Sequence, residues 1–167
     1  MDERQFRSEY EQVADQLYTF ILRTVGDRDL AADILQEAAY RAYRSRRQFR
    51  GDSKFKTWIY RIAVNTMKNQ WARAQRERKW FDEIRDLDSV PSPSPEQLVT
   101  GKEDAARLSG ALMLLEEGYR VAFMLKHVDG LSYTEISKIL GVAENAARVR
   151  VYRARHTLRT ILREDKS

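Results

Sequence analysis

The chain has 167 residues, of which 30 are Lys or Arg and 25 are Asp or Glu, so its formal charge is +5. This length allows one medium domain or two small ones. The absence of cysteine excludes a disulfide framework, thiol chemistry and Cys-ligated metal sites. No apolar run is long enough to cross a membrane, and no secretory signal opens the chain, so we expect a cytoplasmic protein without membrane insertion.

The charge is distributed unevenly along the chain. Residues 41–80 hold 13 basic and 2 acidic side chains, and residues 118–167 hold 10 basic and 5 acidic ones. Residues 1–40 and 81–117 have net charges of −5 and −6. Because Lys and Arg release condensed counterions when they neutralise phosphates, two basic blocks rich in aromatics favour a polyanionic partner. One such block alone would be better explained as a solvated, salt-bridged helix surface.

Apolar residues at spacings of three and four predict three amphipathic helices in the first half of the chain. The first ends at Gly26 and the second starts near Asp29. A Gly-Asp pair then interrupts the pattern, and Ser53 is placed to cap a third helix that runs towards Arg78. Within this third helix Trp58, Ile59 and Ile62 keep helical spacing and are predicted to face the core.

An acidic segment over residues 81–95 contains all three prolines of the chain and is predicted to be an extended linker between two domains. Ser94, Pro95 and Gln97 have the residue types of a cap, a first helical position and a capping box. A helix is therefore expected to follow the linker.

The second half of the chain has the pattern of a helix-turn-helix. A helix expected to stop at Asp129-Gly130 is followed by a capping box of Ser132 and Glu135, a short helix, a glycine turn and a final helix over about 143–162. The second helix of this motif enters the major groove of DNA. No segment alternates as a strand would, so the fold is predicted to be all-α, with two small helical modules.

Six arginines lie on the final helix, which has no acid between Glu144 and Glu164: Arg148, Arg150, Arg153, Arg155, Arg159 and Arg163. These arginines are expected to lack the usual opposite-charge partners at four-residue spacing. DNA phosphates are the anions expected to replace those partners.

Five stretches resemble one known family, the extracytoplasmic-function (ECF) group of bacterial RNA polymerase sigma factors of the sigma-70 type. LSYTEISKILG (131–141) and RVRVYRAR (148–155) resemble its region 4. DILQE (33–37), AYR (42–44) and FRGDSKFKTWIYRIAVN (49–65) resemble its region 2. The stretches cover nearly the whole chain in the order that the family has.

The resemblance implies a non-enzymatic specificity subunit without cofactor or metal. Residues 1–80 would be region 2, which binds core polymerase and recognises and melts the −10 promoter element. Residues 81–95 would be the linker, either a plain tether or an acidic imitation of a phosphate backbone. Residues 96–167 would be region 4, which recognises the −35 element. The implied partners are core RNA polymerase (the β′ clamp helices and the β flap), promoter DNA and an anti-sigma factor that holds the protein inactive.

The resemblance also assigns site residues. The implied polymerase-binding residues share the second helix: Asp33, Gln36, Glu37, Arg41 and Arg44. The implied −10 residues occupy a loop and the helix after it: Phe49, Arg50, Gly51, Asp52, Ser53, Lys54, Lys56, Arg61, Asn65 and Lys68. The implied −35 residues lie on the final helix: Asn145, Arg148, Val149, Tyr152, Arg153 and Arg155.

The residue types suit these roles. Asn65 offers a donor and an acceptor to the Watson–Crick edge of an unstacked base, Phe49 could line or support its pocket, and Gly51 permits close approach of the backbone. The recognition helix departs from the family, which usually has Gly-Thr-Val at 145–147 and Ser at 149. Val149 can make only apolar contacts, for example with a thymine methyl group.

Two alternatives belong to other classes. A sigma-mimic protein that sequesters an anti-sigma factor is disfavoured, because a decoy does not need two basic blocks. A nucleic-acid enzyme is disfavoured because His127 and His156 are isolated and no nucleophile with its base is evident. Trp71 and Trp80 stay open, since either could face the core, DNA or a partner.

Overall fold

The computed structural model describes residues 1–84 and 103–164, except for the side chains of residues 75 and 78–84. The described residues form seven α-helices and one 3₁₀ turn and include no strand. The prediction of an all-α fold with two helical modules is confirmed. None of the helices in these residues is long and apolar enough to cross a membrane.

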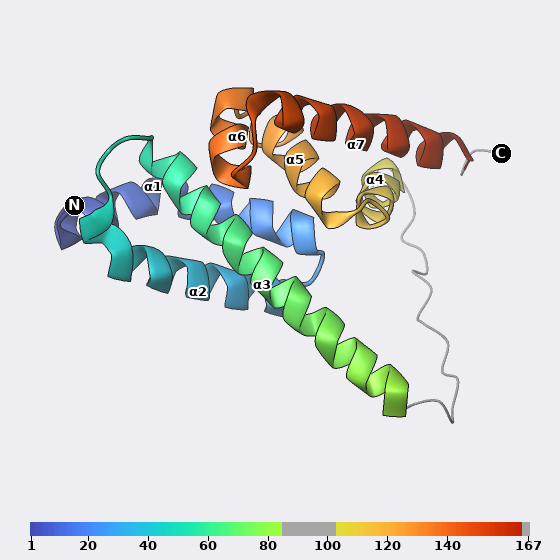
Figure 1. The fold of residues 1–167 in the computed structure, drawn as a ribbon, viewed down its shortest axis with the longest axis horizontal. Coiled ribbons are helices and arrows are strands. Elements are labelled where there is room, and N and C mark those ends of the chain that lie inside the picture. The colour runs from blue at the N-terminus through green and yellow to red at the C-terminus, as the bar shows by residue number, and fades with distance from the viewer. Residues whose placement is uncertain (85–102, 165–167) are drawn as a thin grey trace.

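Each module has its own group of helices (Figure 1). The N-terminal module consists of α1 (Glu3–Val25), α2 (Arg28–Ser45), the 3₁₀ turn η1 (Arg46–Gln48) and α3 (Phe55–Ile84). The C-terminal module consists of α4 (Glu103–Met113), α5 (Glu117–His127), α6 (Tyr133–Leu140) and α7 (Glu144–Glu164).

Several helix ends follow directly from local sequence. The Ser132 hydroxyl accepts a hydrogen bond from the Glu135 N–H at 3.1 Å, and the Glu135 carboxylate accepts one from the Ser132 N–H at 2.9 Å. The predicted capping box is therefore confirmed, and it satisfies two N–H groups that lack partners within α6. Gly141 then turns the chain with a φ of +65° into α7.

Two predictions around the loop before α3 are wrong. The second helix ends at Ser45 and passes into η1, well before the Gly51-Asp52 pair that was expected to break it. The carbonyl of Lys54, not that of Ser53, accepts the first hydrogen bond of α3, from the Trp58 N–H at 3.1 Å. Since the cap residue is the one whose carbonyl accepts the first helical bond, Lys54 occupies that position.

The third helix is longer than expected. It continues past Arg78 to Ile84, so residues 81–84 of the predicted linker are helical. The rest of that linker, and the predicted helix start at Ser94, Pro95 and Gln97, lie outside the described residues.

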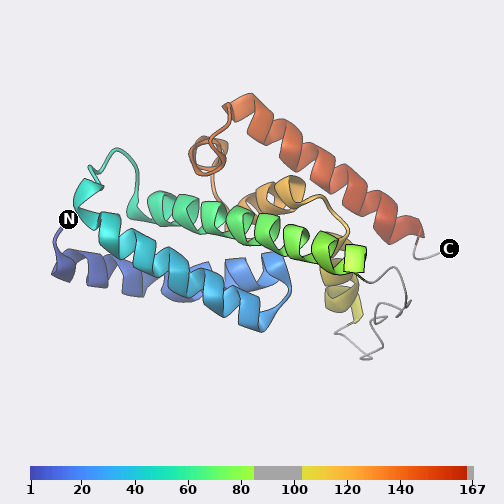
Figure 2. The ribbon, with the colours of Figure 1, turned by 60° about the horizontal axis from the view of Figure 1, so that its bottom comes forward.

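The three long helices of the N-terminal module lie side by side (Figure 2). Their apolar faces meet in a core of fully buried side chains: Leu17, Phe20, Ile34, Ala38, Ile59 and Val64. Ile59 is thus a core residue as predicted, whereas Trp58 and Ile62 are half-buried at the edge of that core. Burial of each large apolar side chain contributes about 1.5–3 kcal/mol.

In the C-terminal module α7 packs across α5 and α6. Its buried residues recur at spacings of three and four and face the core: Ala147, Val151, Ala154 and Leu158. They meet buried residues of the two shorter helices, including Met124 and Ile136. The opposite side of α7 is left exposed for almost its whole length.

The two modules pack directly against each other. Helix α6 lies on α3, and α5 lies on α1, so the buried residues of both modules form one continuous core (Figure 1). At Gly26, whose φ is +74°, the Met113 side chain approaches to 3.1 Å of where a Cβ would stand. We call the surface between the two modules the seam and this arrangement the closed form.

Candidate nucleic-acid interface

Four of the predicted −10 residues share one exposed stripe of α3 and the residue before it. They follow one another at helical spacing: Lys54, Arg61, Asn65 and Lys68. Because three- and four-residue steps bring side chains to one face of a helix, these three cations and one amide form a continuous polar surface. It can hold phosphates along its length and offer Asn65 to a base.

The predicted −10 loop has an aromatic support. Phe49 is half-buried, and its ring centroid lies 5.1 Å from that of Trp58 and 6.1 Å from that of Phe55. Arg50, Gly51 and Asp52 project beyond this cluster and are exposed. Gly51 has a φ of +78°, a left-handed conformation that glycine adopts without the steric cost a Cβ would add. Phe49 therefore holds the loop against α3 and is not itself free to receive a base.

Lys56 does not join the other predicted −10 residues. Its ammonium group donates to Gln16 Oε1 at 3.0 Å and lies 5.6 Å from the centroid of the Tyr60 ring. It lies beside α1, about half a turn round α3 from Asn65. The helical period of 3.6 residues accounts for this, because nine residues are two and a half turns.

The predicted −35 residues form an exposed surface on the first half of α7. Asn145, Arg148, Val149 and Tyr152 share one stripe, in which Val149 is 39% and Tyr152 63% exposed. Arg153 and Arg155 are exposed on either side of it. An apolar and an aromatic side chain surrounded by cations suit a DNA groove, where they can contact bases while arginines meet phosphates.

The prediction that these arginines lack opposite-charge partners is wrong for Arg148. Its guanidinium donates to Glu144 Oε1 at 2.9 Å, one turn earlier in α7, and lies 4.3 Å from the centroid of the Tyr133 ring. The hydrogen bonds from Arg148 and Thr134 hold the pKa of Glu144 below its usual range. Glu144 precedes Arg148 by four residues, so this pair could have been predicted from the sequence. Tyr133, which also contacts Lys126 at 4.4 Å, was not identified from the sequence.

Three of the five predicted polymerase-binding residues line one groove between α2 and α3. Asp33, Gln36 and Glu37 face Gln70 and Arg73 across a space of about 710 Å³. Leu30 and Tyr40 supply its apolar wall, and Tyr40 is 56% exposed. An exposed aromatic ring beside carboxylates suits a basic helical partner.

The remaining two residues of that set lie further along α2. Arg41 donates to Glu37 at 2.6 Å, so this carboxylate already has a partner. The Arg44 guanidinium donates to the Tyr40 hydroxyl at 3.4 Å and lies 5.8 Å from its ring centroid. Arg41 and Arg44 therefore adjoin the groove but do not line it.

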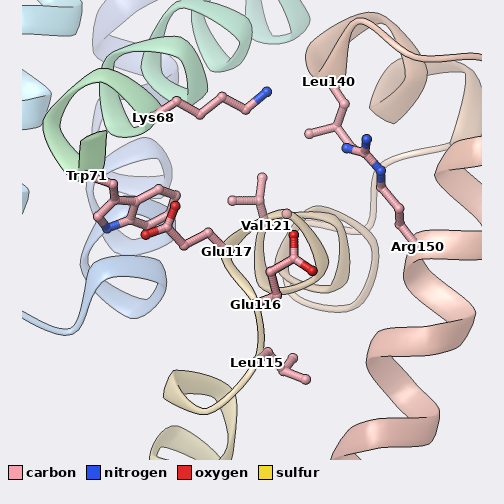
Figure 3. Close-up of a pocket in the computed structure, with 9 residues that line it drawn as sticks. Lys68, Trp71, Leu115, Glu116, Glu117, Val121, Leu140 and Arg150 are labelled. Atoms are coloured by element: carbon pink, nitrogen blue, oxygen red, sulfur yellow. The ribbon is translucent and has the colours of Figure 1, made fainter. Parts of the chain in front are cut away.

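The seam contains a cavity of about 420 Å³ between α3 and the C-terminal module. Figure 3 shows Lys68 of α3 and Arg150 of α7 pointing towards it from opposite sides, with Trp71 and Glu117 at its wall. Burial raises the pKa of Glu117. Trp71, left open by the sequence, thus faces the other module. The side chain of Trp80 is among those that the structure does not describe.

The residues that join the modules most closely were not identified from the sequence. Arg120 is only 8% exposed, and Asp129 is hydrogen-bonded to two residues of the N-terminal module. A signal existed for Arg120, which precedes the buried Met124 by one helical turn and so lies on the apolar face of α5. Within the described part of the chain, no three His, Asp or Glu side chains gather as a metal site would need.

Two separate basic surfaces on a two-module helical scaffold, one of them on a helix-turn-helix, are typical of a DNA-binding protein. Comparison with family models agrees with this class. The model of sigma-70 region 2 matches residues 9–77, and that of sigma-70 region 4 matches residues 105–158.

Relatives and solved structures cover most of the chain. It is 36% identical to the RNA polymerase sigma-H factor of Pseudomonas aeruginosa, over 86% of this chain and 81% of the relative. It is 37% identical to the ECF RNA polymerase sigma-E factor of Escherichia coli K12, over 75% and 70%. The sigma factor RpoE of Bartonella quintana, solved in complex with the anti-sigma factor NepR, superposes with a TM-score of 0.74 at 26% identity, covering 96% of this chain and 98% of that one. CnrH, solved with the cytosolic domain of CnrY, shares the fold with a TM-score of 0.70 at 23% identity, over 98% and 91%.

The chain belongs to the ECF group of the sigma-70 family of RNA polymerase sigma factors. It is a transcription initiation subunit that binds core RNA polymerase and promoter DNA, and it is not an enzyme. The comparisons favour this function over that of a sigma mimic.

Proposed function

We propose a division of labour between the modules of this sigma factor. Residues 1–80 bind core polymerase and recognise and melt the −10 element, residues 81–95 link the modules, and residues 96–167 recognise the −35 element. The single observation that carries the proposal is the presence of two exposed polar surfaces, on α3 and α7, that belong to different modules.

At the −10 element the stripe on α3 tracks the single strand. Lys54, Arg61 and Lys68 are exposed cations that hold its phosphates, and Asn65 hydrogen-bonds the Watson–Crick edge of an unstacked base. Arg50, Gly51, Asp52 and Ser53 form the rim of the pocket for that base. Phe49 supports this loop from below, which its contacts with Phe55 and Trp58 favour.

Lys56 has a different part in the proposal. Its contacts with Gln16 and Tyr60 hold its ammonium group away from the stripe. Both contacts lie within the N-terminal module and remain when the modules part, so Lys56 is not among the proposed phosphate contacts.

At the −35 element the first turns of α7 lie in the major groove. Asn145, Arg148, Val149 and Tyr152 face the base edges, while Arg153 and Arg155 contact the edges of the groove. The hydrogen bond of Arg148 to Glu144 orients its guanidinium along the helix.

The groove between α2 and α3 receives the β′ clamp helices of core polymerase, and the C-terminal module docks on the β flap. The carboxylates of Asp33 and Glu37 and the exposed ring of Tyr40 support this assignment. Arg41 and Arg44 extend the contact along α2 beyond the groove.

We further propose that an anti-sigma factor holds the protein inactive and that it works in the cytoplasm with RNA polymerase. The support is its similarity, over both modules, to RpoE in its complex with the anti-sigma factor NepR.

The test separates polymerase binding from strand opening. Core polymerase is combined with the wild-type chain or with Asn65→Ala, and a promoter selected from a randomised library by the wild-type holoenzyme serves as template. Asn65→Ala should keep its affinity for core polymerase and lose permanganate reactivity of −10 thymines. Asn69→Ala, an exposed amide on α3 one turn further, is the matched control and should behave as wild type. Loss of core binding by Asn65→Ala would contradict the surface assignment, and absence of promoter-directed transcripts with the wild type would contradict the function.

A further inference from the structure

The closed form cannot engage both promoter elements at once. The −10 and −35 positions are 25 base pairs apart by definition, which is roughly 85 Å along a duplex that rises about 3.4 Å per base pair. In the structure Asp52 and Arg61 of the N-terminal module line one cavity of about 430 Å³ together with Lys138 and Gly141 of the helix-turn-helix. The modules must therefore separate before both sites can be used, a step that rests on the proposed function.

The first polar contact across the seam is made by Arg120, in the first turn of α5. Its Nη1 donates to the main-chain carbonyl of Thr24 at 2.9 Å, and its Nη2 donates to that of Leu115 at 3.1 Å. Thr24 lies in the last turn of α1, where carbonyls have no partner within the helix and where the helix dipole favours a cation. The guanidinium also lies 5.8 Å from the Trp71 ring of α3.

The second contact is made by Asp129, which follows the other end of α5. Its Oδ1 accepts hydrogen bonds from the Tyr60 hydroxyl and from Gln16 Nε2, both at 3.1 Å. Its Oδ2 is buried and has no hydrogen-bond partner. A third contact, between Lys54 and Glu135 at 3.4 Å, involves a lysine that is 82% exposed and is therefore weak.

The two buried contacts have matched spacing. Arg120 and Asp129 are nine positions apart on the C-terminal module, and their partners Thr24 and Gln16 are eight positions apart on α1. At about 1.5 Å per helical residue both intervals are roughly 12–14 Å. Helix α5 thus lies antiparallel to α1 and is fastened to it near both ends.

We propose that Arg120 and Asp129 are positioning residues that latch the C-terminal module to the N-terminal module, and that release of these two latches is the step that frees the protein for promoter binding. The Arg120 latch keeps its bonds to Met113 and Leu115 when the modules part, so opening breaks only its contacts with Thr24 and Trp71. The Asp129 latch is lost entirely, because both of its donors belong to the N-terminal module.

The test measures the distance between the modules in the free protein. Because the chain has no cysteine, Glu11→Cys and Thr157→Cys, both at exposed positions, give a unique pair of spin or dye labels. Tyr60→Phe removes only a hydroxyl from a residue that stays buried, and Gln16→Ala alters an exposed residue, so neither threatens folding. Each should raise the ratio of open to closed molecules about fivefold, the effect of one ordinary hydrogen bond. The matched control is Gln12→Ala, one turn earlier on α1, where the side chain bonds only to its own helix.

Two substitutions of Asp129 sharpen the result. Asp129→Ala removes the latch and should raise the open fraction further. Asp129→Asn keeps an accepting oxygen without a buried charge and should lower the open fraction below that of wild type, while Asp104→Asn on exposed α4 should change nothing. Arg120→Lys tests the second latch. It replaces a guanidinium that donates to main-chain carbonyls of both modules by a single ammonium group, and it should raise the open fraction.

Equal open fractions for Gln16→Ala, Tyr60→Phe and Gln12→Ala would overturn the proposal, as would a wild-type protein that is fully open without DNA. The readout needs neither polymerase nor promoter. If the distances contradict the latches, the result of the transcription experiment still stands. If transcription fails, the distances can still be interpreted.

Discussion

The arginines of the C-terminal module fall into two groups with opposite surroundings. Arg153 and Arg159 on α7 are exposed, whereas Arg120 on α5 is 8% exposed and donates to main-chain carbonyls of both modules. The N-terminal module repeats the contrast, since Lys68 is exposed and Lys56 is bonded to Gln16. A cation can meet a polyanion only if the fold leaves it exposed. The net charge of a segment counts both kinds together, so it overstates the DNA-binding surface.

The sharpest way to test this contrast is to remove one arginine of each kind. Arg120→Ala leaves the carbonyls of Thr24 and Leu115 without a donor, and it should lower the free energy of unfolding by about 2–4 kcal/mol. Arg159→Ala, at an exposed site, should change it by no more than about 0.5 kcal/mol. Urea denaturation followed by circular dichroism measures both, and equal midpoints for the two variants would contradict the contrast.

DNA binding should show the reverse order. Arg153→Ala should weaken binding to a −35 duplex by about 1–3 kcal/mol if the guanidinium reads a base. Its only described side-chain bond, to the Tyr119 hydroxyl at 3.4 Å, is exposed, so the unfolding midpoint should stay near that of wild type. Fluorescence anisotropy with matched and scrambled −35 duplexes distinguishes the roles. The contact with the groove edge proposed above predicts a uniform loss on both duplexes with a shallower salt dependence, whereas a loss confined to the matched duplex would reassign Arg153 to a base.

The two modules also differ in how they use glycine. Gly51 in the loop before α3 has a φ of +78° with open space around it, so Gly51→Ala should cost about 1 kcal/mol of stability through backbone strain alone. Gly110, which also has open space but lies inside α4, should respond in the opposite sense. Gly110→Ala is expected to stabilise the protein by roughly 0.5–1 kcal/mol. Thermal unfolding measures both shifts, and a stabilising Gly51→Ala would refute the left-handed conformation of the loop.

The smallest expected effect concerns pH. Burial raises the pKa of Asp129 in the closed form, although the hydrogen bond from Tyr60 and the charges of Lys56 and Arg23 oppose the rise. When the modules part, this carboxyl returns towards its ordinary pKa of about 3.9. In the closed form the Asp129 carboxyl binds its proton more tightly than in the open form. The closed form is therefore stabilised relative to the open form as the pH falls through the raised pKa towards the ordinary pKa.

The labelled wild-type protein should therefore show an open fraction that falls as the pH is lowered from neutral towards the ordinary carboxyl pKa of about 3.9. Tyr60 stays protonated throughout, because burial and the nearby carboxylate raise its pKa. Asp129→Asn removes the titrating group and should abolish the change. The same pH response in wild type and Asp129→Asn would mean that another group controls it.

Local features were predictable because they depend on neighbours in the chain. The Ser132–Glu135 capping box, the stop at Gly26 and the position of α7 all follow from spacing and residue type. The sequence could also have shown that Lys56 and Asn65 lie on opposite faces of α3, because nine residues make two and a half helical turns. The family motif groups Lys56 with Asn65, although helical phase separates them.

The seam was beyond sequence reasoning. The bonds of Asp129 join residues that are 113 and 69 positions apart, and helical periodicity gives the buried face of a helix but not its partner. The charged side chain of Arg120 on an apolar stripe signalled a buried guanidinium. It could not indicate that one of the acceptors is the carbonyl of Thr24 in the other module.

In the proposed mechanism one set of helices serves two arrangements, closed in the free protein and open on the promoter. The most direct measurement is the distance between labels at Glu11→Cys and Thr157→Cys, first in the free protein and then in the holoenzyme bound to promoter DNA. A single short distance in the free protein should be replaced by a distance that is several tens of ångströms longer, since the two elements lie roughly 85 Å apart along the duplex. An unchanged short distance in a complex that transcribes would contradict the account.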